Sequence, residues 1–384
     1  MAETPMPMGS TWRRSVRFVI TWVKLSWKDI LTIAIIGATS LGVYNAPVPF
    51  TRNFPITFTT SGDIVYPDLA YPSNRGWVIS PTLSGVLSSV IPIAVIALAQ
   101  LRIRSFWDFN NAILGVLYSL ALGALFQAVV KVLVGSYRPY WLDVCQPDVS
   151  RAAANNDTGL NGVGFRQIMF TPTVCTNTDT RALRNAMTGF PSGHATAGFA
   201  GYTFLFLWMN AKLKVWADFQ AGFYWLALLL APALGAVLIA GSLTIDMAHH
   251  WYDIVGGSLL GFAVAVMVYR LLYAAVWDWR FNHIPLRRDR VFDYAAAAGL
   301  MPEIKQRYVF TTKLGWGRKR KSGLRRARGK GADNVRNGVN SRKDTELPEQ
   351  PEEVERIPQE RVSYPSPAAV RGDTSQCGGR EEMV

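Results

Sequence analysis

Six apolar runs dominate the first three quarters of the chain. Each approaches or exceeds the roughly 20 helical residues that cross about 30 Å of hydrocarbon, and small residues are scattered through them, as expected where helices pack closely in lipid. Buried core helices of a large soluble protein are the alternative, but six such runs within about 250 residues favour membrane spans. The pattern predicts an all-α bundle of six transmembrane helices, near residues 30–46, 78–100, 109–130, 195–209, 221–241 and 254–276.

The two ends of the chain differ from its middle. The first run begins well inside the chain and lacks a small-residue cleavage site, which favours a span over a signal peptide. Residues 311–332 hold nine Lys or Arg and no acid, and residues 343–360 are rich in Glu and Pro, which is typical of disorder. We expect a cytoplasmic segment over 1–26, a six-helix membrane domain over 27–290 and a mostly disordered cytoplasmic tail over 291–384.

The charge balance narrows the class of protein. The chain of 384 residues is 49% hydrophobic and 17% charged, with a formal net charge of +13, whereas about 25% of residues are charged in soluble domains. The surplus could mark nucleic-acid binding or the cytoplasmic side of a membrane protein. It lies in the tail and in short connections, so we expect no nucleic-acid partner, and residues 311–332 suit anionic lipid head groups.

The connections between the runs predict an orientation, because cytoplasmic loops carry an excess of Lys and Arg. Cations precede the first run and fill two short connections, whereas the charges in the long connections 47–76 and 140–190 balance. Both termini are therefore predicted to be cytoplasmic. The cations that predict this orientation are Arg13, Arg14, Arg17, Lys24, Lys28, Arg102, Arg104, Lys212 and Lys214.

The long connection at residues 140–190 carries two marks of a lumenal or extracellular side. An N-glycosylation sequon begins at Asn156, although such triplets also occur by chance. An oxidising lumen would let Cys145 and Cys175 pair, whereas two isolated cysteines can also stay reduced. We expect a multi-pass protein of the plasma membrane or of an endomembrane such as the vacuole, Golgi or endoplasmic reticulum.

Three polar clusters interrupt the apolar pattern, and ionisable residues at a membrane are functional candidates by default. Residues 131–139 end the third run, residues 191–194 begin the fourth, and residues 242–253 separate the fifth from the sixth. The predicted orientation places all three clusters on the non-cytoplasmic face, which indicates one composite active site. Their candidate members are Lys131, Arg138, Ser192, Gly193, His194, His249, His250 and Asp253.

The residue types in these clusters suit work on an anion. Lys131 and Arg138 are cations suited to phosphate, and residues 192–193 open a helix whose N–H groups can point at it. His249 and Asp253 lie four residues apart on one helical face, so the carboxylate can hold one ring nitrogen and free the other as a nucleophile. The sequence contains no Cys cluster, HExxH pattern or Walker-type loop, and we expect no metal or cofactor.

Each cluster alone has a plainer explanation. Lys131 could be an anchor whose charge reaches the membrane surface, residues 191–193 could be a turn and helix cap, and Asp253 could be the partner of a helix dipole. The occurrence of all three clusters on one predicted face favours an active site over these separate explanations.

Together the clusters resemble the signature of a known family. Lys-x6-Arg-Pro, Pro-Ser-Gly-His and a third part ending in His-x3-Asp are typical of type 2 phosphatidic acid phosphatases and their haloperoxidase relatives. The resemblance in order, spacing and six-helix topology covers about residues 25–290, and residues 277–286 look like the end of the fungal lipid phosphate phosphatase branch. The haloperoxidase relatives are soluble, unlike this chain.

The resemblance implies a metal-independent phosphatase that acts on phosphatidic acid, lysophosphatidic acid or diacylglycerol pyrophosphate in the bilayer. His249 would attack phosphorus and form a phosphohistidine, and Asp253 would orient it. His194 would protonate the leaving alcohol and then activate water. The phosphoryl oxygens would be held by Lys131, Arg138, Ser192 and Gly193.

One position departs from the signature, because Leu243 stands where the family has Arg. Loss of one donor to the transition state typically costs about 10²–10³ in rate. Two other hypotheses therefore stay open: a catalytically impaired member that binds lipid phosphate or a partner without turnover, and a six-span channel or transporter. The channel gives no reason for His249 and Asp253 to lie beside residues 191–194. The oligomeric state is not predicted by the sequence.

Overall fold

Helices form at all six apolar runs in the computed structural model, which describes residues 8–48, 52–56, 61, 67–73, 76–151, 169–288 and 291–295. Among the described residues, α2, α3, α7 and α8 are long and apolar enough to cross a membrane. The chain is thus mostly helical and has four candidate spans, and the crossing of all six helices stays a prediction. The six helices are α1 (Met8–Asn45), α2 (Pro81–Ile103), α3 (Phe106–Val134), α6 (Gly193–Leu213), α7 (Phe223–Ile245) and α8 (Trp251–Leu272).

The chain divides into two units, Met1–Lys321 and Ser322–Val384. Every described residue belongs to the first unit. The sequon at Asn156, the basic block at residues 311–332 and the Glu- and Pro-rich stretch lie outside the described residues. The predictions of glycosylation, of lipid binding by the basic block and of a disordered tail therefore stay predictions.

Helix α1 is longer than the apolar run that predicted it. It begins at Met8 rather than near residue 30, so it includes most of the segment that was expected to precede the first span. No Gly or Pro lies between residues 11 and 36, and the helical backbone accepts Lys and Arg as readily as Leu. Hydropathy marks the apolar part of such a helix, whereas its ends depend on where helix-breaking residues occur.

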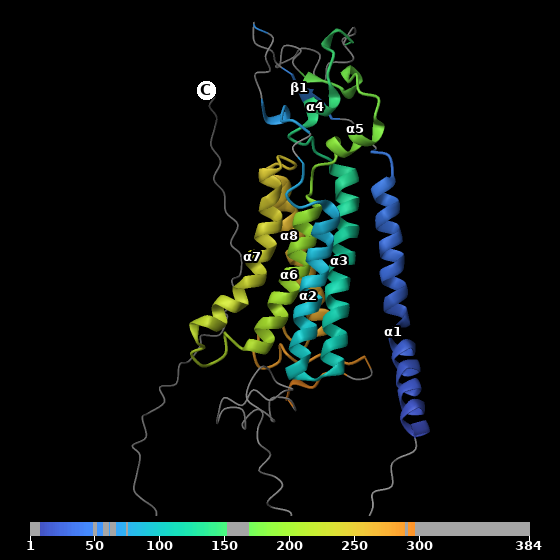
Figure 1. Cartoon of the computed structure of the whole chain (residues 1–384), viewed down its shortest axis with the longest axis vertical. Helices are drawn as coiled ribbons and strands as arrows, with labels where there is room; N and C mark the ends of the chain where they lie inside the picture. Colours follow the sequence, from blue (N-terminus) through green and yellow to red (C-terminus); the bar gives the residue numbers. More distant parts are fainter. Residues whose placement is uncertain are drawn as a thin grey trace, which may run out of the picture. The chain divides into compact units, whose positions relative to one another are not determined.

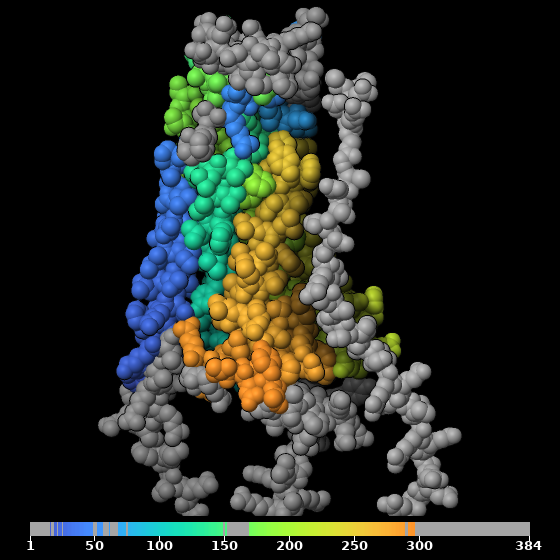
Figure 2. Space-filling model, turned by 180° about the vertical axis from the view of Figure 1, so that it is seen from behind, coloured from blue at the N-terminus to red at the C-terminus, as the bar shows by residue number. Residues whose placement is uncertain are grey.

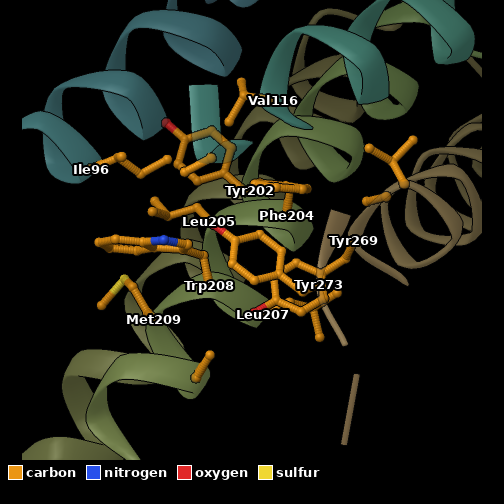
Figure 3. Close-up of a cluster of buried hydrophobic side chains, with 14 of the residues drawn as sticks. Ile96, Val116, Tyr202, Phe204, Leu205, Leu207, Trp208, Met209, Tyr269 and Tyr273 are labelled. Carbon is orange, nitrogen blue, oxygen red and sulfur yellow. The ribbon is translucent and has the colours of Figure 1, made fainter. Parts of the chain in front are cut away.

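Helix α6 lies at the centre of the bundle and packs against α2, α3, α7 and α8. Two glycines let the backbones approach: a side chain at Gly201 would overlap the carbonyl oxygen of Ser88 on α2, and one at Gly261 on α8 would overlap that of Thr196. Figure 3 shows the apolar side chains that fill the space around α6. They include Ile96, Val116, Tyr202, Phe204, Leu205, Leu207, Trp208, Met209, Tyr269 and Tyr273.

Helix α1 packs along α3. Figure 2 shows α3, in teal, between the blue α1 and the gold α8 on one face of the bundle. Since α3 also contacts α2 and α6, it joins α1 to the rest of the helices. The residues at the end of α3 are thereby held between several elements.

A small cap of short elements covers one end of the bundle, where α4 (Trp141–Cys145), α5 (Thr180–Met187) and β1 (Phe54–Pro55) gather (Figure 1). Strand β1 pairs antiparallel with β2 (Met169–Phe170), and three 3-10 turns, Pro67–Leu69, Val149–Arg151 and Pro172–Val174, complete the cap. Phe54 and Trp141 pack edge to face at 5.3 Å in its apolar centre. A disulfide joins Cys145 to Cys175, which confirms the pairing that the sequence left open.

Candidate active site

The three polar clusters meet at the capped end of the bundle, which we call the motif end: α3 ends there, α6 begins there, and α7 turns into α8. They surround a cavity of about 760 Å³. Its lining includes side chains or backbone from all three clusters, which lie far apart in the sequence. The cluster members that line it are Lys131, Arg138, Gly193, His194 and His249.

His249, in the turn before α8, contacts Asp253, in the first turn of α8. Asp253 is fully buried, and its Oδ2 lies 3.4 Å from Nδ1 of His249. The same oxygen accepts the backbone N–H of His250 at 3.1 Å and closes the capping box of α8. Asp253 therefore acts both as a helix cap and as the partner of His249, so the plainer explanation holds and does not exclude the functional one.

The site holds His249 in its neutral form. Burial lowers the pKa of its imidazole well below 6.5, and the charges of Arg138 and Lys131 lower it further. The Asp253 carboxylate keeps Nδ1 in place, and a neutral imidazole held at one nitrogen can use the other as a nucleophile. These are the properties that attack on a phosphorus atom requires.

Two buried cations face the cavity. Lys131 ends α3 with 5% exposure and donates from Nζ to the carbonyl of Thr188 at 3.0 Å. Arg138 is 6% exposed and donates from Nη2 to Oδ1 of Asn185 at 3.1 Å, while its buried Nε has no partner among the described residues. Neither cation forms an ion pair in the part of the chain that the structure describes. Such donors suit a phosphoryl group.

Helix α5 fixes the position of Arg138. The backbone N–H of Arg138 donates to Ala186 at 2.8 Å, and that of Ser136 donates to Met187 at 3.0 Å. Gly189 donates back to Ser136 at 2.7 Å. The segment after α3 is therefore hydrogen-bonded through its backbone to the end of α5 and the residues that follow it. In this way the cap of the bundle holds Arg138, one of the phosphate-binding candidates.

Ser192 and Gly193, at the start of α6, have different roles. Ser192 is fully buried, its Oγ accepts the N–H of Ala195 at 3.4 Å, and its own N–H donates to Asp253 at 2.9 Å. Gly193 lines the cavity and brings the positive end of the helix dipole to it. Ser192 thus serves as helix cap and as a link to α8, and its expected contact with a phosphoryl oxygen stays a prediction.

His194 lies in the first turn of α6 and is 7% exposed. Its Nε2 is 3.1 Å from the carbonyl oxygen of Ile79, and the ring of Trp77 stacks on it with centroids 5.6 Å apart. It lines the same cavity as His249. A second imidazole beside the first can exchange a proton with a leaving group or with water.

Leu243 is fully buried in the last turns of α7, and it is not among the residues that line the cavity. Its backbone carbonyl accepts the N–H of Ala248 at 3.1 Å. The side chain offers no donor, so the two cations Lys131 and Arg138 are the signature's charges at this site.

Several other residues that line the cavity lie outside the three polar clusters. Gln127 lies one turn before Lys131 in an otherwise apolar run, and its Nε2 donates to Pro191 at 3.4 Å. That position could have been found, because a polar residue four before a buried Lys shares its helical face. Nothing in the sequence connects α5 or the segment before α2 with the motifs. Their lining residues include Trp77, Arg181, Arg184 and Asn185.

Comparisons with known proteins agree with these motifs. The family model described as the PAP2 superfamily matches residues 112–277. The chain is 32% identical over 218 residues to a PA-phosphatase related-family protein of Dictyostelium discoideum, a match covering 57% of this chain and 63% of that protein. It is 30% identical over 257 residues to the probable diacylglycerol pyrophosphate phosphatase 1 of Schizosaccharomyces pombe, covering 65% and 84%.

A plant protein is also similar. Lipid phosphate phosphatase 2 of Arabidopsis thaliana is 28% identical over 256 residues, which cover 66% of this chain and 78% of that protein. The matched part of the family model includes all three polar clusters and the helices α6, α7 and α8. No solved structure matches the chain.

Proposed function

The chain belongs to the PAP2 superfamily, and from that premise we propose that it is an integral-membrane lipid phosphate phosphatase that works through a phosphohistidine and needs no metal or cofactor. The observation that carries the proposal is the arrangement around His249: a buried neutral imidazole, held by Asp253, lines the same cavity as two buried cations that form no ion pair among the described residues. Nucleophile, orienting acid and anion site are then all present in one place.

The proposed reaction has two steps. In the first, Nε2 of His249 forms a bond to phosphorus, the bond from phosphorus to the lipid oxygen breaks, and a proton from His194 goes to that oxygen. In the second, His194 takes a proton from water, whose oxygen attacks the phosphohistidine and releases phosphate. Lys131, Arg138 and the amide of Gly193 stabilise the negative charge on the phosphoryl oxygens in both steps. The protein ends with its original protons.

The proposed substrate is a phospholipid that stays in the bilayer while its phosphate enters the cavity. Relatives of the chain are named for lipid phosphate and for diacylglycerol pyrophosphate, so phosphatidic acid, lysophosphatidic acid and diacylglycerol pyrophosphate are the candidates. The cavity lies at the end of helices that are apolar enough for a membrane. An amphiphile can reach such a site without leaving the lipid phase.

Phosphate release from phosphatidic acid in detergent micelles tests the proposal. Purified wild-type protein should release phosphate in the presence of EDTA, and His249→Ala should lose that activity because no other group can take its place as nucleophile. Trp251→Leu is the control, since Trp251 is 72% exposed at the start of α8 and does not line the cavity. Equal rates for wild type and His249→Ala would refute the proposal.

Leu243 favours a second candidate function, a member that binds lipid phosphate without turnover. A missing donor costs about 10²–10³ in rate, and Leu243 has none to offer. That candidate expects binding of phosphatidic acid vesicles by the wild type without phosphate release, and a gain of turnover in Leu243→Arg. The control is Leu243→Met, which keeps the apolar volume and adds no charge.

A further inference from the structure

A three-residue segment before α2, residues 77–79, contacts the imidazole of His194. Gly76 has a left-handed φ of +81°, which turns the chain, and Ser80 caps α2, so the residues between them form a short, fixed connection. Within it, Trp77 stacks on the His194 ring at 5.6 Å and 11°, and the Ile79 carbonyl lies 3.1 Å from Nε2. Both contacts come from residues that no signature motif includes.

The segment is held in place by Asp246. The backbone N–H of Val78, between the two residues that contact His194, donates to Oδ1 of Asp246 at 3.0 Å. Asp246 follows the last residue of α7 and is 8% exposed. One carboxylate from the third polar cluster therefore anchors the segment that contacts the histidine of the second.

We propose that Asp246 is a positioning residue for His194: by holding Val78, it keeps the Ile79 carbonyl on Nε2, so that Nδ1 is the atom that exchanges the proton with the lipid oxygen. This inference rests on the proposed phosphatase function and adds a residue and an atom to it.

The carbonyl determines which nitrogen is free. A carbonyl oxygen can only accept a hydrogen bond, so Nε2 of His194 carries a proton whenever this contact is made. The proton that moves during the reaction must then be on Nδ1. The arrangement resembles that at His249, where Asp253 occupies one nitrogen and leaves the other for chemistry.

The indole of Trp77 restricts the ring further. Parallel packing on one face of His194 blocks rotation of the imidazole, and the indole face also favours the protonated ring through a cation–π interaction. A group that donates a proton in the transition state loses about 10²-fold in rate when it is misplaced by about 1 Å. Trp77 fixes the plane of the His194 ring and the Ile79 carbonyl fixes its Nε2, so together they would prevent this loss of rate.

Helix capping or ion pairing does not account for Asp246. Its backbone N–H already bonds to Ser242 and Thr244 at the end of α7, so the side chain is not needed for that helix. Its Oδ2 is buried without a hydrogen-bond partner among the described residues, and no Lys, Arg or His in that part of the chain forms an ion pair with it. A buried carboxylate in such a setting costs stability. What it provides is the contact with Val78 and a negative charge that interacts with the His194 ring.

The test compares two leaving groups, because proton donation matters only when the leaving oxygen is strongly basic. The diacylglycerol of phosphatidic acid would leave as an alkoxide and needs the proton from His194, whereas p-nitrophenyl phosphate releases a stable p-nitrophenolate and does not. The quantity to measure is the first-turnover rate, phosphate transfer to His249, for each substrate in the same detergent. Asp246→Ala should lower the rate for phosphatidic acid about 100-fold and the rate for p-nitrophenyl phosphate less than about 3-fold.

Three other variants sharpen the comparison. Asp246→Asn keeps an oxygen that accepts the Val78 N–H, so it should restore most of the rate. Trp77→Leu should show the same selective loss as Asp246→Ala, and it serves as the test if Asp246→Ala does not fold. Asp143→Ala is the matched control, because Asp143 accepts the N–H of Ser73 at 2.7 Å in the same connection but does not line the cavity; its two rates should equal those of the wild type.

Equal losses on both substrates in Asp246→Ala and Trp77→Leu, or no loss on either, would overturn the inference. A wild-type protein that transfers phosphate from neither substrate would instead overturn the proposed function. The two failures are therefore distinguishable.

Discussion

At the scale of single residues, the site depends on keeping a histidine uncharged beside a carboxylate. An exposed imidazole near Asp253 would take up a proton, and protonation would remove the nucleophilic lone pair. Burial and the neighbouring cations Arg138 and Lys131 oppose this and lower the pKa of His249. The two cations that we propose to bind the phosphoryl group would thus also prepare the proposed nucleophile.

The pH dependence of kcat/KM should report this effect. Since the pKa of His249 lies below its usual 6.5, the neutral form persists as pH falls, and the acid limb should lie below pH 6.5. Arg138→Gln removes one cause of the lowered pKa, so the limb should move up toward 6.5, together with a loss of about 10²-fold in rate. Arg102→Gln is the control: Arg102 lies in the last turn of α2, at the end of the bundle opposite the motifs, so this variant should leave the acid limb in place. A limb that stays or moves down in Arg138→Gln would contradict this explanation.

At the scale of elements, the cap of short helices and turns decides where Arg138 lies. Helix α5 holds the backbone of residues 136–138, and the cap that contains α4 and α5 is closed by the disulfide between Cys145 and Cys175, which are 30 residues apart. A covalent bond between such positions reduces the freedom of the unfolded segment. The cap consists of short elements around a small apolar centre, so the disulfide is a main constraint on its structure.

Removing the disulfide should loosen the cap and then the site. For a closed loop of this length, about 3–4 kcal/mol of stabilisation is expected. The Cys145→Ala/Cys175→Ala variant should therefore melt at a lower temperature and lose activity faster on heating, as should wild-type protein treated with reductant. Cys377→Ala is the control and should keep its sensitivity to reductant. Unchanged melting of the double variant would show that the cap is held by its apolar centre alone.

Several of these elements could be predicted from the sequence, for physical reasons. Long apolar runs favour helices, so the pattern predicts all six. The order and spacing of the motifs predict that Lys131, His194 and His249 meet, and they line one cavity. The length of α1 was missed because its charged half has no apolar signal. Trp77 and Asn185 were missed because their contacts depend on how separate connections fold over the bundle, which no local pattern records.

At the scale of the whole molecule, the end of the bundle opposite the motifs has a buried polar network. Lys212 lies 2.6 Å from Asp108, and both side chains are 3% exposed. Lys214 donates to Oδ1 of Asn282 at 2.7 Å and to Nδ1 of His283 at 2.9 Å, and burial lowers the pKa of His283 so that it stays neutral and accepts. Loss of one partner of a buried ion pair costs about 3–5 kcal/mol, so the Lys212–Asp108 pair stabilises the contact between α6 and α3. The hydrogen bonds of Lys214 hold the segment after α8 against the end of α6.

The network does not remove these lysines from the prediction of orientation. Lys212 and Lys214 are each 3% exposed and bonded inside the protein. Orientation follows the number of Lys and Arg in a connection, and an acidic partner such as Asp108 contributes little to it. The predicted orientation therefore rests on these two lysines together with the cations before the first apolar run and Arg102 and Arg104.

Cysteine labelling in sealed microsomes, cytoplasmic face outward, tests the predicted orientation. Arg104 follows α2 at the end opposite the motifs, and Ser150 lies in the cap at the motif end; both are exposed. In a Cys377→Ala background, with Cys145 and Cys175 held in their disulfide, Arg104→Cys should react with a membrane-impermeant maleimide in intact vesicles. Ser150→Cys should react only after detergent is added. The reverse pattern would place the cavity on the cytoplasmic side, where phosphate would be released into the cytoplasm and the disulfide would face a reducing compartment.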